Sequence, residues 1–128
     1  MAWNDKRPMS PHLEIYKLPF TAILSILHRA TGVALSAGVF LLVWTLAMAA
    51  NSPESYQFAH SLLSSWFGYL VLFSFTLAFY YHLCTGIRHL FWDLGRGLEL
   101  DSTAKSGKAI LAVTALLTLI TWLVALAG

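Results

Sequence analysis

Long apolar stretches divide the chain and are separated by short groups of charged residues. No charged residue lies between Arg29 and Glu54, between Glu54 and Arg88, or after Lys108. Each stretch provides about the 20 residues that a helix needs to cross the hydrocarbon of a bilayer. Because a helix satisfies its own backbone hydrogen bonds in lipid, the pattern predicts an all-α integral membrane protein. Its three transmembrane helices are expected over residues 21–50, 61–92 and 108–128.

The segments outside the apolar stretches contain residues typical of turns and caps. Prolines at positions 8, 11 and 19 interrupt the N-terminal segment, so residues 1–20 are expected to lie as an arm along the membrane interface. A turn is expected at residues 51–53, and a loop at residues 100–107 with Asp101 and Ser102 as candidate helix caps. No repeat divides the chain, so residues 1–128 are expected to form one domain.

Composition and charge support a membrane location and suggest an orientation. The chain is 58% hydrophobic and 11% charged, which leaves too little polar surface to coat a soluble globule. Its eight lysines and arginines lie before or at the start of the first helix and between the second and third helices. By the positive-inside rule, the N-terminus and the second loop face the cytoplasm, or the matrix in a mitochondrion. The basic residues thus indicate topology, and no nucleic-acid partner is expected.

Two polar clusters interrupt the apolar helices. Ser25, His28, Arg29 and Gly32 share one stripe of the first helix, and His82, Gly86 and His89, with Arg88 and Asp93 nearby, lie towards the end of the second. Ionisable groups inside a membrane usually mark a functional site. Since the two helices run in opposite directions, both clusters are expected at one depth, in the cytoplasmic half of the bilayer.

The residues themselves leave two readings for each cluster. His82 either binds another helix by a hydrogen bond or ligates a heme iron, and a second heme ligand would then come from a partner, because His89 lies on the same helix. Arg29 either reaches the interface as a snorkelling cation or, with Ser25, stabilises the negative charge that a quinone gains on reduction. His28 and His89 are candidate propionate or quinone contacts. Asp93 either relays protons with them or pairs with His89 or Arg96.

Three ordered motifs resemble the cytochrome b subunit family of succinate dehydrogenase, the membrane anchor of respiratory complex II. They are residues 7–13 (RPMSPHL) with Ile15-Tyr16, residues 25–32 (SILHRATG), and residues 82–90 (HLCTGIRHL) with Trp92-Asp93. The resemblance covers nearly the whole chain. A fumarate reductase anchor is the nearest rival, and a small transporter or channel subunit is the alternative from another class.

The resemblance implies a role for each of these residues. His82 would be an axial ligand of a heme b iron, with the second histidine in the other anchor subunit. Ser25 and Arg29 would contact ubiquinone, His28 and Arg29 would approach the heme propionates, and Asp93 would lie near the quinone. An iron–sulfur subunit and a flavoprotein subunit with FAD would complete the enzyme, so this chain alone would not oxidise succinate. The expected location is the bacterial cytoplasmic membrane, with the mitochondrial inner membrane as the alternative.

Overall fold

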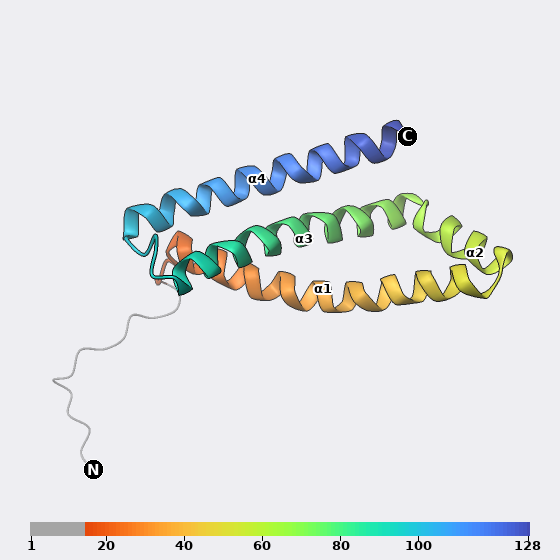
Figure 1. Cartoon of the computed structure of the whole chain (residues 1–128), viewed down its shortest axis with the longest axis horizontal. Helices are drawn as coiled ribbons and strands as arrows, with labels where there is room; N and C mark the ends of the chain where they lie inside the picture. Colours follow the sequence, from red (N-terminus) through yellow and green to blue (C-terminus); the bar gives the residue numbers. More distant parts are fainter. Residues whose placement is uncertain (1–14) are drawn as a thin grey trace, which may run out of the picture.

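The computed structural model describes residues 15–128, and this part of the chain folds into four helices without a strand. They are α1 (Phe20–Asn51), α2 (Pro53–Leu63), α3 (Trp66–Asp93) and α4 (Leu100–Ala127) (Figure 1). Three of them, α1, α3 and α4, are long and apolar enough to cross a membrane. The prediction of an all-α protein with three transmembrane helices is confirmed. Most of the predicted interfacial arm lies outside the described residues.

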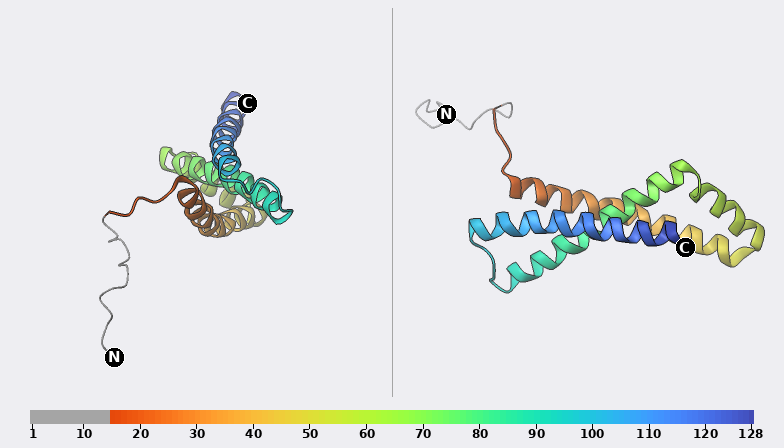
Figure 2. Two further views of the ribbon diagram at one scale, coloured as in Figure 1. Left: turned by 90° about the vertical axis from the view of Figure 1, so that its left-hand side faces the viewer. Right: turned by 90° about the horizontal axis from the view of Figure 1, so that it is seen from above.

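The three long helices run side by side, and α3 lies between α1 and α4 (Figures 1 and 2). Consecutive long helices point in opposite directions, so the end of α3 lies near the start of α1 and of α4. A buried cluster joins all three there, with Leu24 from α1, Tyr81 from α3 and Ile110 from α4. Gly107 of α4 lies so close to α1 that a Cβ at this position would be 2.6 Å from Leu24 Cδ1. The best-packed part of the bundle therefore lies beside the two polar clusters.

The predicted turn at residues 51–53 lies where α1 ends and α2 begins, but the predicted start of the second span at residue 61 was wrong, because a short helix follows the turn. Ser52 caps α2 by accepting a hydrogen bond from the Ser55 amide at 3.1 Å. Pro53 occupies the first turn, where its missing N–H costs nothing. Figure 1 shows α2 bridging the far ends of α1 and α3. The second span begins at Trp66 rather than Ser61. Ser65 directly precedes α3 and caps it, because its hydroxyl accepts a hydrogen bond from the Gly68 amide.

The predicted loop at residues 100–107 was also wrong, because α4 already begins at Leu100. Its N-cap residue is Glu99, without a side-chain capping bond, rather than Asp101 or Ser102. Asp101 lies in the first turn, where a negative charge interacts favourably with the helix dipole. It also forms an exposed ion pair with Lys105 one turn later, at 2.6 Å. These local interactions extend the helix through a polar segment that resembled a loop.

Large apolar side chains cover the outside of the helices. Val33 and Phe40 on α1 are 74% and 78% exposed, and Leu123 and Val124 on α4 are 60% and 69% exposed. A soluble protein rarely exposes contiguous apolar surface of this extent. Lipid and other membrane-spanning chains are the surroundings that suit these faces.

Candidate functional site

Three histidine rings from two helices stack at the level of the buried cluster. His28 of α1 lies parallel to His82 of α3, with ring centroids 4.1 Å apart and an interplanar angle of 9°. Its centroid is 4.9 Å from that of His89, at an angle of 22°. The structure therefore brings the histidines of the two sequence clusters together, with His28 in contact with both α3 rings.

The ring of His82 is fixed by the backbone of α1. Its Nδ1 lies 3.0 Å from the carbonyl oxygen of His28 and 3.2 Å from Thr31 Oγ1. Since the carbonyl only accepts, Nδ1 carries the proton in this arrangement and Nε2 keeps its lone pair. Gly32 makes the approach feasible, because a Cβ there would lie 3.0 Å from His82 Cε1. The half-buried imidazole thus keeps one nitrogen available to a ligand.

A buried threonine orients the other two histidines. Thr85 of α3 is 1% exposed, and its hydroxyl lies 2.5 Å from His28 Nδ1. The same hydroxyl donates to the carbonyl of Tyr81 at 2.8 Å, so it accepts the His28 N–H. The Thr85 carbonyl accepts from His89 Nδ1 at 2.7 Å. One residue between the helices therefore sets the orientation of both rings.

A tyrosine ties α1 to α3 beside the histidines. The hydroxyl of Tyr81, which is 6% exposed, donates to the carbonyl of Leu24 at 2.7 Å. The roles of Tyr81, Thr31 and Thr85 were not predicted from the sequence. The available signal was their position, within one helical turn of His28 or His82.

Ser25 and Arg29 lie on α1 one turn before and directly after His28. Arg29 is exposed, and its Nε donates to the carbonyl of Ser25 at 3.5 Å, along the same helix. Among the described contacts, none joins either side chain to a histidine of α3. Both groups therefore remain accessible to a molecule at the helix surface.

Asp93 is the last residue of α3 and is exposed. The expected pairs with His89 and Arg96 do not form, since the Lys105–Asp101 pair is the only salt bridge among residues 15–128. Asp93 lies one turn beyond His89 towards the helix end. Its carboxylate is thus placed outside the histidine stack.

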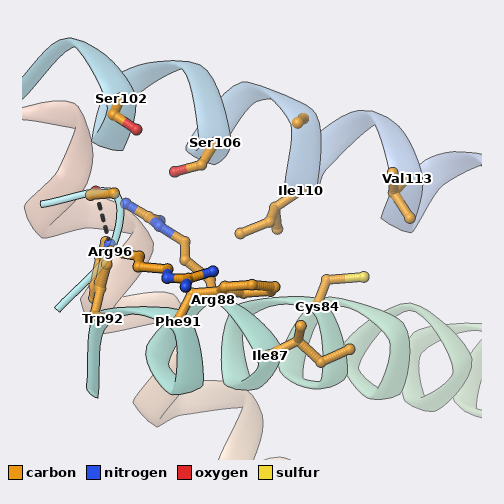
Figure 3. Close-up of a pocket in the computed structure, with 12 residues that line it drawn as sticks. Cys84, Ile87, Arg88, Phe91, Trp92, Arg96, Ser102, Ser106, Ile110 and Val113 are labelled. Carbon is orange, nitrogen blue, oxygen red and sulfur yellow. Dashed lines mark hydrogen bonds between the residues drawn. The ribbon is translucent and has the colours of Figure 1, made fainter. Parts of the chain in front are cut away.

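Arg88 points away from the histidines and towards α4. It is 7% exposed and donates to the carbonyl of Thr103 at 3.1 Å. Its guanidinium carbon lies 4.2 Å from the centre of the Trp92 ring, at cation–π distance. The indole of Trp92 in turn donates to the carbonyl of Gly97 at 3.1 Å (Figure 3). Arg88 and Trp92 therefore stabilise the connection between α3 and α4.

The site by itself does not form a closed metal centre. Among the described residues, no group of three or more histidine, cysteine, aspartate or glutamate side chains is placed to hold a metal ion. The stacked rings donate through Nδ1 to helix groups, and His28 and His82 lie face to face. Any metal bound here would need further ligands from outside residues 15–128.

Comparison with known proteins gives a consistent match over most of the chain. Residues 4–121 match the family model described as succinate dehydrogenase/fumarate reductase transmembrane subunit. The succinate dehydrogenase cytochrome b556 subunit of Paracoccus denitrificans is 46% identical over 124 residues, which cover 94% of this chain and 95% of that protein. The corresponding subunit of Rickettsia felis is 42% identical over 92% of both chains.

A mitochondrial relative shows the same similarity. The succinate dehydrogenase cytochrome b560 subunit of Dictyostelium discoideum is 40% identical over 89% of this chain and 60% of its own length. The region matched by the family model contains the histidine stack, the Ser25–Arg29 segment, all of α1 and α3, and α4 up to residue 121. The chain therefore belongs to the family of succinate dehydrogenase and fumarate reductase transmembrane subunits, as a cytochrome b membrane anchor.

Proposed function

We propose that this chain anchors a succinate:ubiquinone oxidoreductase, complex II, in the membrane and provides one axial ligand, His82, to a heme b. The observation that carries the proposal is the Nδ1 contact of His82 with the His28 carbonyl, at 3.0 Å. A histidine that ligates a metal usually donates its other ring N–H to a carbonyl or carboxylate, which fixes the tautomer and the ring orientation. The proposed ligand atom is Nε2.

The surroundings of His82 fit a large planar cofactor. Gly86, one turn along α3, has no atom within 4 Å of the position that a Cβ would occupy. His28, His89 and Arg29 lie near the same end of the helices, where protonated or cationic side chains would interact with propionates. When bound, the heme supplies an iron centre that takes up and releases single electrons. The second axial histidine is assigned to the other anchor subunit.

Ser25 and Arg29 are proposed to bind the ubiquinone headgroup. A hydroxyl and a cation on one helix face provide two donors for a carbonyl oxygen that gains negative charge as the quinone is reduced. Neither terminal amine of Arg29 is engaged by another described side chain, and Ser25 is half-buried. Protons would reach this region through Asp93, at the end of α3, and through His89 and His28 of the stack.

The partners follow from what the chain lacks and from its family. Its one cysteine leaves no ligand set for an iron–sulfur cluster. FAD and the iron–sulfur clusters are therefore assigned to the flavoprotein and iron–sulfur subunits, which would pass electrons from succinate oxidation, a step of the tricarboxylic acid cycle, to ubiquinone. The exposed apolar faces suit the second anchor and lipid. The bacterial cytoplasmic membrane is the proposed location, with the N-terminus inside, and the mitochondrial inner membrane is the alternative.

Optical spectroscopy of the purified complex tests the heme assignment. His82→Ala is expected to abolish the absorbance band of the reduced heme, while dye-linked succinate oxidation shows that the enzyme still assembles. His60→Ala provides the matched control, because His60 is exposed on α2 and distant along the chain from the stack. A transporter subunit has no reason to show such a band. An unchanged band in His82→Ala would exclude the ligand assignment.

A further inference from the structure

A cavity lies between α3 and α4, and none of the three stacked histidines lines it. Its volume is about 390 Å³. Figure 3 shows Arg88, Trp92 and Arg96 at one end, near Ser102, and Cys84 and Val113 at the other. One end of the cavity is therefore polar and cationic, and the other is apolar.

The cationic end contains an arginine whose donors are only partly used. Arg88 is 7% exposed, and one terminal amine donates to the Thr103 carbonyl. Its Nε is buried and has no hydrogen-bond partner. A buried donor without a partner is destabilising, and more so when it is charged. A negative charge at this end of the cavity would interact favourably with the largely buried guanidinium.

The other polar groups at this end are donors as well. Arg96 lines the cavity from the loop after α3, and the hydroxyls of Ser102 and Ser106 line it from the first turns of α4. Within residues 15–128, no acidic side chain lines the cavity. The nearby carboxylate of Asp101 is already paired with Lys105. Two guanidinium groups and two hydroxyls thus surround one space, and the described part of the chain provides no counter-ion there.

We propose that this cavity binds an anionic phospholipid. The phosphate would accept from the Arg88 and Arg96 guanidinium groups and the Ser102 hydroxyl, and the upper part of one acyl chain would lie against the apolar end. The site lies at the end of α3 and the start of α4, where basic pockets between membrane helices bind lipid headgroups. The volume suits the phosphate and part of one chain, with the remainder of the lipid in the bilayer. This proposal is independent of the heme and quinone assignments.

Native mass spectrometry of the detergent-purified complex counts the lipids that remain bound. Arg96→Gln removes a cavity charge, and Lys108→Gln is its control, since Lys108 is exposed on α4 and does not line the cavity. Ala109→Phe fills the cavity, and Ala112→Phe places the same ring on α4 outside it. One phospholipid fewer is expected in each cavity variant, and the wild-type count in each control. Equal counts in all four variants would overturn the proposal.

Adding ligands back to the delipidated complex distinguishes a lipid from a free anion. Phosphatidylglycerol is expected to raise the thermal midpoint of the wild-type complex by several degrees, and that of Arg96→Gln by less. Phosphatidylcholine and inorganic phosphate are expected to have little effect. An equal shift with inorganic phosphate would indicate an anion site instead of a lipid site, and an equal shift with phosphatidylcholine would exclude headgroup recognition. Recovery of a quinone in place of the lipid would also overturn the proposal.

Discussion

The imidazole rings of His28 and His82 lie parallel, 4.1 Å apart, although 54 residues separate them along the chain. The contact depends on a close approach of two antiparallel helices at Gly32 and on hydroxyl and carbonyl groups that hold each ring. The geometry of the site is thus set by the seam between α1 and α3, and substitutions in that seam should affect the cofactor.

Gly32→Ala is expected to lower the heme content of the purified complex and to shift the reduced band. The added methyl would lie 3.0 Å from His82 Cε1 and displace the ring from the His28 carbonyl. Gly38→Ala is the matched control, because its methyl would lie equally close to Phe75 Cδ1, away from the stack. Equal heme content and spectra in both variants would contradict a role for this contact in positioning the ligand.

Thr85→Val is expected to lower the stability of the complex by about 1–3 kcal/mol, because the His28 N–H loses its buried acceptor. Thr118→Val should be close to neutral, since the Thr118 hydroxyl is buried without a partner. Thermal midpoints of the solubilised complexes measure the difference. If both variants lose the same stability, the Thr85 hydroxyl contributes nothing specific to the stack.

Ser25→Ala and Arg29→Ala are each expected to reduce ubiquinone reduction about tenfold or more, as for loss of one donor to a developing negative charge. Succinate oxidation with an artificial dye acceptor should stay at the wild-type rate, because that reaction does not need the quinone site. Ser36→Ala is the control, since the Ser36 hydroxyl bonds to its own helix, at the Gly32 carbonyl. Parallel loss of both activities would refute the quinone assignment.

The cap of α2 should be visible in an acid titration. The backbone amide of Glu54 and then the Ser52 hydroxyl lower the pKa of the Glu54 carboxyl below its usual value of 4.5. Because the folded pKa is the lower one, the stabilisation is complete above the unfolded pKa and is lost as pH falls through the folded pKa. Ser52→Ala should therefore raise the pKa of Glu54, as measured by NMR titration of its carboxyl carbon. Asn51→Ala, which leaves the Ser52 hydroxyl in place, should not.

The three transmembrane spans were predicted well because the uncharged stretches of sequence are long. The short helix α2 and the start of α4 were predicted poorly. Pro53 indicated a turn, yet proline also suits the first turn of a helix, and α2 begins there. The segment from Leu100 contained residues typical of loops, but the Asp101–Lys105 pair supports a helix. The loop and helix conformations of such a short segment differ in free energy by less than tertiary packing contributes, so packing decides between them.

The site was predictable in position but not in its contacts. Antiparallel helices place His28 and His82 at one level, which follows from counting residues. The hydroxyls of Thr31 and Thr85 were missed because such groups in helices usually bond only to their own backbone. The direction of Arg88 depends on the rotation of α4 against α3, about which the sequence pattern carries no information.

The nearest partner of the His82 ring on α1 is a peptide oxygen, at 3.0 Å, with the Thr31 hydroxyl at 3.2 Å beside it. Every amino acid brings that oxygen, so replacing the residue at position 28 leaves the anchor in place. The chemistry next to the ring can therefore change while its backbone anchor stays in place, provided that the helix stays regular and the residue at position 32 stays small.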